Sequence, residues 1–205
     1  KTSHLISCGT AICGGSAIAA IAPVIKSDEK QTSVALGVIF ILNSIALFLF
    51  PSIGHWLDLS QQEFGLWCAI AIHDTSSVVG AANKYGPEAL QIATTVKLAR
   101  ALWIIPIALL TSVLFKNKSN KVKIPYFIGL FILAMLMNTY IPQTALLAPY
   151  LVNIAKIGLT LTLFLIGAGL NFNVLKSVGL KPLFQGVLLW IFIGTAALLS
   201  IMYFS

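Results

Sequence analysis

The sequence predicts a multi-pass membrane protein built only from α-helices. Hydrophobic residues make up 58% of the 205 residues and charged residues only 9%, and the mean hydropathy is +0.94. Because a soluble domain carries about 25% charged residues, this chain has too little charge to cover a water-exposed surface. The apolar residues form long continuous blocks, whereas a transmembrane β-barrel has short alternating segments. The predicted location is therefore the bacterial inner membrane, with the lipid bilayer as a partner.

Apolar segments of the length that a bilayer requires recur along the chain. About 20 mostly apolar residues are needed for one helical crossing. We expect a single transmembrane domain with seven such segments, at residues 5–25, 32–53, 64–83, 89–115, 124–140, 146–170 and 182–204. The chain begins at Lys1 and enters an apolar segment almost at once, so we also expect that an N-terminal part of the domain is absent.

The net charge of +7 does not indicate a nucleic-acid partner. The basic residues fall mainly in the short connections, where the positive-inside rule places them in membrane proteins. Cys8, Cys13 and Cys68 each lie inside an apolar run, without the spacing of a metal site. We therefore expect buried small hydrophobic side chains at these positions, and no metal or cofactor beyond the alternative of a bound sodium ion.

The first apolar segment has an unusual composition for a membrane helix. It reads "SCGTAICGGSAIAA" over residues 7–20, with Gly14 and Gly15 near its middle. Small residues allow close packing between helices, which is the structural interpretation. Two adjacent glycines also allow a helix to break, which is tolerated in a membrane only where protein or a wet cavity covers the freed backbone groups. We favour the break.

The third segment contains "CAIAIHDTSSVVGAA" at residues 68–82, with His73 and Asp74 near its centre. An ionised Asp at the middle of a membrane helix costs about 2.5–3.5 kcal/mol on insertion scales. One interpretation is a neutral Asp74 that forms hydrogen bonds with Thr75 or Ser77 across a packed interface. The other is a binding site for an ion, a proton or a substrate, which is the default for an ionisable residue inside a membrane.

Three basic residues also lie within apolar runs. Lys97 and Arg100 are three positions apart and share one face of the fourth segment. They are interpreted either as interfacial residues whose stems extend toward water or as charges near the site. Lys156 lies deeper in the sixth segment and is a candidate ion-pair partner of Asp74, unless that helix starts later and Lys156 faces external water.

An enzymatic function is not expected. A catalytic triad needs a nucleophile, a base and an orienting group that converge in space, and adjacent residues on a helix, such as His73 and Asp74, point about 100° apart. The sequence also contains no GxSxG, HExxH or Walker A motif.

Several blocks resemble the YeiH-type family, an uncharacterised family of multi-pass membrane proteins whose name refers to sulfate export. The resemblance rests on "LISCGTAICGGSAIAAIAPVI" (5–25), "FGLWCAIAIHDTSSVVGAA" (64–82) and "VKLARALWIIPIALL" (96–110), with support from "FLIGAGLNFNVLKSVGLKPL" (164–183). It covers most of this chain, which matches the C-terminal part of family members. The resemblance implies discontinuous helices and the inverted repeats of a secondary transporter, whose broken helices meet at the bilayer midplane.

The function predicted from these observations is alternating-access transport of a small inorganic or organic anion, coupled to a proton or sodium. Sulfate or an organosulfonate is the substrate class that the resemblance implies. Asp74 would bind the coupling cation, and Lys156 or Arg100 would balance its charge. The anion would be held by backbone N–H groups around the first break and by the polar residues of the third segment, a set that comprises Thr10, Gly14, Gly15, Ser16, His73, Thr75, Ser76 and Ser77.

Two other functions stay open at this stage. One is an ion channel or a cation-binding membrane protein without substrate transport. The other is a structural subunit of a membrane complex, although a scaffold has no need for a buried Asp or a glycine break. A homodimer is an alternative that the sequence does not decide.

Overall fold

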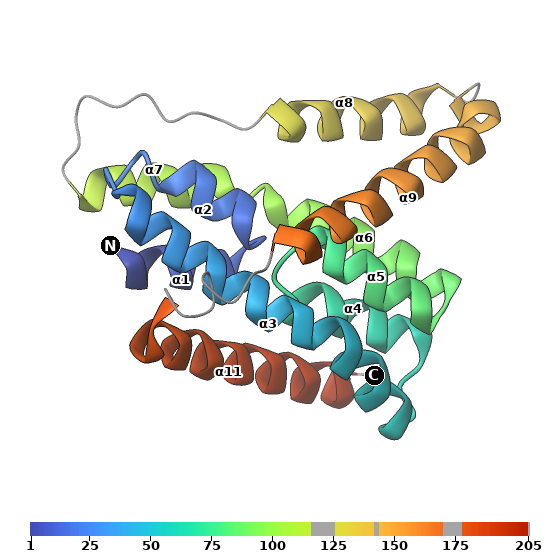
Figure 1. Ribbon diagram of the computed structural model, residues 1–205. Coiled ribbons are helices and arrows are strands. Elements are labelled where there is room, and N and C mark those ends of the chain that lie inside the picture. The colour runs from blue at the N-terminus through green and yellow to red at the C-terminus, as the bar shows by residue number, and fades with distance from the viewer. Residues whose placement is uncertain (116–125, 142–143, 170–177, 205) are drawn as a thin grey trace.

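A computed structural model describes residues 1–115, 126–141, 144–169 and 178–204. These residues form an all-α protein, and no strand occurs among them. The helices are α1 (Thr2–Ala11), α2 (Gly15–Ile21), α3 (Glu29–Trp56), α4 (Gln61–Ala71), α5 (Thr75–Tyr85), α6 (Pro87–Ala101), α7 (Ile104–Leu114), α8 (Tyr126–Tyr140), α9 (Thr144–Gly169) and α11 (Leu180–Phe204) (Figure 1).

The predicted membrane class is confirmed by the lengths and hydropathy of these helices. Within the described ranges, three stretches are long and apolar enough to cross a bilayer: Glu29–Trp56, Pro87–Leu114 and Leu180–Phe204. The second stretch consists of α6 followed by α7, which are separated only by a turn at Leu102 and Trp103. The protein is therefore a multi-pass membrane protein.

Other expected segments are divided or only partly described. The segment expected at 5–25 consists of α1 and α2, and the segment expected at 64–83 consists of α4 and α5. The late block at 164–183, which supported the resemblance, lies partly outside the described residues. The two divided segments are separated in sequence by the uninterrupted helix α3.

Helix α3 lies at the centre of the bundle, and the broken segments pack around it (Figure 1). Its residues Ile39 and Leu42 are buried with Leu5 of α1 and Ile18 of α2. A second apolar cluster joins the C-terminal half of α3 to α4 and α5, with Phe64 fully buried in it. As predicted, the three cysteines Cys8, Cys13 and Cys68 are buried and unpaired.

Helix α6 packs along both halves of the second broken segment, α4 and α5. This contact places the side chains of α6 against the point where α4 ends and α5 begins. Helices α8 and α9 extend away from this body, and α9 returns to contact α5 (Figure 1). Their described apolar side chains are largely exposed, as in Leu133, Tyr150 and Phe164, which suits a surface that faces lipid.

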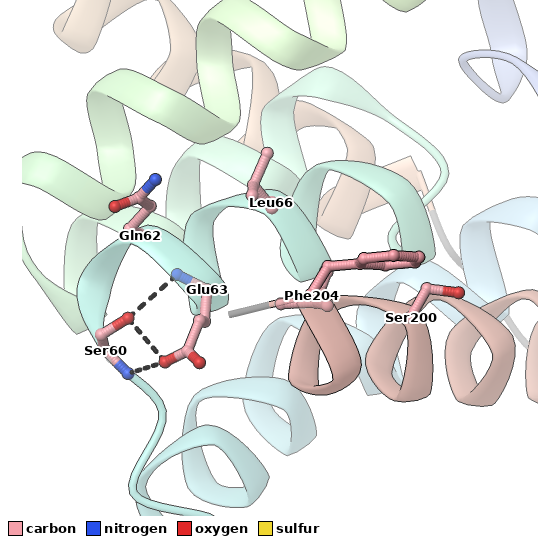
Figure 2. A pocket seen from close by; sticks show the side chains of 7 residues that line it. Ser60, Gln62, Glu63, Leu66, Ser200 and Phe204 are labelled. Carbon is pink, nitrogen blue, oxygen red and sulfur yellow. Dashed lines mark hydrogen bonds between the residues drawn. The ribbon is translucent and has the colours of Figure 1, made fainter.

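The start of α4 is defined by a polar capping box. The Ser60 Oγ accepts a hydrogen bond from the Glu63 N–H at 3.2 Å, and the Glu63 carboxylate accepts one from the Ser60 N–H at 2.8 Å (Figure 2). Such reciprocal bonds satisfy two backbone donors that a helix start leaves free. Ser60 and Glu63 also line a surface pocket of about 610 Å³. Ser200 and Phe204, at the end of α11, line the other part of this pocket.

Helix α11 is held against the core by close backbone contacts. The indole N–H of Trp67 donates to the carbonyl oxygen of Gly194 at 2.9 Å. At Gly186, an added Cβ would lie only 2.3 Å from Cγ1 of Val38. At Gly194, the nearest atom to an added Cβ is 3.8 Å away.

This difference predicts a selective effect of alanine in α11. Gly186→Ala should lower the free energy of unfolding by about 1–2 kcal/mol, because the added methyl group overpacks the contact with the stiff side chain of Val38. Gly194→Ala is the matched control and should leave the stability unchanged or slightly raised. Thermal unfolding of both variants in detergent measures the effect, and equal melting temperatures would contradict the close approach of α11 to α3.

Candidate functional site

The break in the first segment forms at Gly14, as the glycine pair predicted. Helix α1 ends at Ala11 and α2 begins at Gly15. Gly14 has φ +65° and ψ −119°, a backbone conformation that side chains strongly disfavour. Its N–H donates to the carbonyl oxygen of Gly9 at 2.8 Å, so the chain reverses without leaving that donor unsatisfied.

The second break lies at residues 72–74, where the sequence had placed His73 and Asp74 on a helix. The structure corrects that expectation, because Ile72 and Asp74 have extended backbone conformations that end α4 and precede α5. Helices α4 and α5 have 11 residues each and so are each about 16 Å long at 1.5 Å per residue. The two helices lie side by side, because the Tyr85 hydroxyl donates to the Leu59 carbonyl oxygen and the rings of Phe64 and Tyr85 stack. Since the hydrocarbon core of a bilayer is about 30 Å thick, a hairpin of this length that enters from one surface places the break between α4 and α5 near the midplane.

The two breaks touch each other. An added Cβ at Gly14 would lie 3.3 Å from both the carbonyl carbon and the carbonyl oxygen of His73. The His73 side chain is fully buried, and its backbone N–H donates to Oδ1 of Asn43 at 3.0 Å. Asn43 lies on α3, so the central helix supports the junction of the two broken segments. We call this junction the crossing, defined by residues 12–14 and 72–74.

Asp74 acts as the N-cap of α5. Its Oδ1 accepts from the Ser77 N–H at 2.7 Å, and its Oδ2 accepts from the Ser77 hydroxyl at 2.8 Å. A hydrogen bond between Asp74 and Ser77 was one of the sequence-based alternatives, but it forms within one helical turn and not across an interface. A carboxylate is favourable here because a helix N-terminus carries a partial positive charge.

Lys97 and Arg100 bind the C-terminal ends of the two half-helices. Nζ of Lys97 donates to the carbonyl oxygens of Ala69 at 3.2 Å and Ile72 at 2.5 Å, both at the end of α4. Lys97 is fully buried, which favours the internal position over the interfacial one, the two alternatives that the sequence left open. The main-chain partners explain how a cation is accommodated there, since a helix C-terminus carries a partial negative charge.

The Arg100 guanidinium joins the two broken segments. It donates to Ile70 of α4 at 2.5 Å, and to Thr10 at 3.0 Å and Ala11 at 2.6 Å of α1. Its planar group, with five N–H donors, suits two sets of acceptors at once. Lys97 and Arg100 therefore neutralise the carbonyl ends of both half-helices from one face of α6.

Some polar groups of this region have no hydrogen-bond partner among the described residues. They are the Thr10 hydroxyl, the Asn43 Nδ2 and both ring nitrogens of His73, and all of them are buried. A buried polar atom without a partner costs about 1–3 kcal/mol. These groups therefore have free capacity to bind a ligand or water near the crossing.

The structure places the other predicted site residues at different depths. Gly15 and Thr75 begin α2 and α5 and are half-buried, Ser76 and Ser77 are buried, and Ser16 is exposed. Lys156 lies in α9, but its side chain lies outside the described residues, so its pairing with Asp74 stays a prediction. Asn43 was missed, although a lone Asn in the apolar run "FILNSIA" (40–46) is a signal that could have identified it.

Comparison with known proteins gives a family match over most of the chain. The family model described as "Conserved hypothetical protein 698" matches residues 1–186. A UPF0324 membrane protein of Bacteroides thetaiotaomicron is 60% identical over 207 residues, which cover 99% of this chain and 62% of the relative. A UPF0324 membrane protein of Shewanella oneidensis is 55% identical, over all of this chain and 65% of the relative.

The chain thus spans less than two thirds of the length of these relatives. No solved structure shows a significant match to it. The match of the family model to residues 1–186, together with identities of 55–60% to the two relatives, shows that this chain belongs to the UPF0324 family of membrane proteins.

Proposed function

We propose that this protein is a secondary transporter of a small anion, with the crossing as its binding centre. Transport would proceed by alternating access, coupled to a proton or sodium, without covalent chemistry. Sulfate or an organosulfonate is the proposed substrate class, by resemblance to the YeiH-type family. The observation that carries the proposal is the contact between two broken segments whose carbonyl ends are neutralised by two cations of α6, the fully buried Lys97 and the half-buried Arg100.

The charge balance of the crossing favours an anion. Lys97 and Arg100 contribute two formal positive charges, and Asp74 contributes one negative charge. The cations lie at the negative ends of α1 and α4, and Asp74 offsets the positive N-terminal end of α5, so the N-terminal end of α2 is left without a charged partner. Broken helices in transporters direct such N-terminal ends toward anionic substrate groups.

The hydrogen-bonding groups around the crossing support a ligand of this kind. The hydroxyl of Thr10, the amide of Asn43 and the ring of His73 retain unused hydrogen-bonding capacity. Ser76 lies in the first turn of α5, where backbone N–H groups other than that of Ser77, which donates to Asp74, are also available. An oxyanion such as sulfate accepts hydrogen bonds from all of these donors.

Asp74 is positioned so that binding of a cation to its carboxylate would change the conformation of the crossing. Both of its carboxylate oxygens hold Ser77 in the first turn of α5. Binding of a proton or a sodium ion to this carboxylate would weaken those two hydrogen bonds. The start of α5 would then shift relative to α4, which is the type of change that alternating access requires.

The substitution Asp74→Asn tests this coupling. Asparagine is as good an N-cap as aspartate, so the variant should fold with a melting temperature within a few degrees of the wild type. We expect anion uptake into proteoliposomes to lose its dependence on the imposed cation gradient. A first screen of sulfate, sulfite, taurine, carboxylates and chloride by thermal stability identifies the anion to use, because a ligand of the folded state raises the melting temperature.

A matched control is available at the start of α3. Asp28 accepts from the Gln31 N–H at 2.7 Å and caps α3 as Asp74 caps α5, but it lies outside the crossing. Asp28→Asn should leave coupled uptake unchanged. Full, cation-coupled uptake by Asp74→Asn would refute the coupling role, and non-saturating anion currents would favour a channel.

A further inference from the structure

The carbonyl ends of broken membrane helices are general cation sites. In transporters with discontinuous helices, unwound backbone carbonyls and half-helix C-termini coordinate sodium ions or replace their hydration. Beside the crossing, five carbonyl oxygens of this type accept side-chain hydrogen bonds, those of Thr10, Ala11, Ala69, Ile70 and Ile72. Each of them accepts a hydrogen bond from Lys97 or Arg100.

The two cations have different roles at these carbonyls. The Arg100 guanidinium is wide and planar, and it links α1 to α4. The Lys97 ammonium is compact and monovalent, and it binds two carbonyl oxygens of one half-helix end. A lysine ammonium is a point charge with three donors, and in charge and position it corresponds to a bound monovalent ion.

The burial of Lys97 strengthens this comparison. Its side chain is fully buried, so bulk water does not reach its charge. Burial of a charge is costly unless polar groups compensate for it. The carbonyls of Ala69 and Ile72 provide that compensation, as they would for a desolvated metal ion.

We propose that the Lys97 ammonium occupies a monovalent-cation site made by the carbonyl oxygens of Ala69 and Ile72, and that this built-in cation makes the crossing independent of sodium. This inference deepens the proposed function, on which its transport part rests: of the two coupling ions, it excludes sodium and leaves the proton. Its binding part stands on the geometry alone.

A cavity variant can uncover the cation site. Lys97→Ala removes three methylene groups and the ammonium group, which together have the shape of n-propylammonium. The variant leaves the carbonyls of Ala69 and Ile72 without their donor, so an added cation should bind there. Lys97→Met is the matched control, because its side chain fills the apolar part of the space and carries no charge.

The experiment measures melting temperatures of the full-length protein in detergent at constant ionic strength. Sodium, potassium, choline and n-propylammonium chlorides are compared for the wild type and both variants. We expect the wild type to melt at the same temperature, within about a degree, in all four salts. Lys97→Ala should melt at a lower temperature and recover saturably with n-propylammonium or sodium, whereas Lys97→Met should be destabilised without recovery.

Two results would overturn the inference. One is a saturable rise in the melting temperature of the wild type with sodium that potassium and choline do not produce. This measurement needs no variant, so it can refute the inference even if neither variant folds. The other is a folded Lys97→Ala variant that responds to none of the cations. Uptake assays separate this inference from the proposed function: sodium-driven anion uptake would retain the transporter and refute sodium independence, whereas absence of any anion uptake would refute the transporter and leave the cation-site result unaffected.

Discussion

Replacement of Arg100 by alanine is expected to lower the free energy of unfolding by about 3 kcal/mol. The Arg100 guanidinium makes five hydrogen bonds to described main-chain carbonyls of α1 and α4. Interhelical hydrogen bonds in a membrane protein contribute about 0.6 kcal/mol each, which gives a loss of this size. The loss is large because the substitution removes the cation from the carbonyl end of α1 and leaves that of α4 with Lys97 alone.

Arg100→Lys separates the role of the positive charge from the role of the planar guanidinium group with its several N–H donors. Lysine retains the positive charge but presents it at one point, so it cannot bind α1 and α4 together. We therefore expect Arg100→Lys to recover less than half of the lost stability. Denaturant titration of the wild type and both variants in detergent measures this, with Lys84→Ala, at an exposed lysine of α5, as the control.

The expectation for Arg100 fails if Arg100→Ala unfolds like the Lys84→Ala control. In that case the guanidinium contacts would not hold the two broken segments together. A variant with full stability but no anion-dependent change in melting temperature would indicate that Arg100 acts on the ligand only.

Replacement of Gly14 by alanine is expected to destabilise the protein by about 2–3 kcal/mol. The φ of +65° with ψ of −119° at Gly14 is a strained conformation for any residue with a side chain, at about 1–3 kcal/mol. In addition, the new Cβ would lie 3.1 Å from Cγ2 of Ile39 and 3.3 Å from the carbonyl oxygen of His73. The added methyl group would therefore push the two breaks apart.

The neighbouring glycine provides the control. Gly15 lies in the first turn of α2, and the nearest atom to an added Cβ is Cδ2 of Leu36 at 3.5 Å, an ordinary contact. Gly15→Ala should keep or slightly raise the stability, since alanine favours a helix by up to about 1 kcal/mol over glycine. Thermal unfolding of the pair checks this, and a Gly14→Ala variant as stable as Gly15→Ala would contradict the backbone conformation at the break.

The first break could be predicted from its own residues, whereas the second was only partly predictable. Two adjacent glycines inside an apolar run indicate where a helix can end, because glycine adopts a backbone conformation with positive φ without strain. At the second break, Ile72 and His73 carry no such preference, and only the pair of Asp74 and Ser77 has the sequence of an N-cap. The chain ends α4 there because Asn43 and Lys97 bind the backbone of residues 72 and 73.

The roles of Lys97 and Arg100 illustrate why the rest could not be predicted. Their spacing showed that they share one face of a helix, and interfacial and internal positions were equally consistent with that spacing. Their partners are main-chain carbonyl oxygens of residues such as Ala11, Ala69 and Ile72. Every residue has a carbonyl group, so the sequence of the acceptor segment contains no signal for these bonds.

The sequence alone determined the membrane class, the all-α architecture, the break at the glycine pair and the unusual position of Asp74. These properties depend on composition and on local backbone preference, which are set by each residue and its neighbours in the sequence. Only the tertiary structure decided that the two breaks touch and that α6 delivers two cations to their carbonyl ends. Such contacts join residues about 30 to 90 positions apart through backbone groups, and they exist only once the helices have packed.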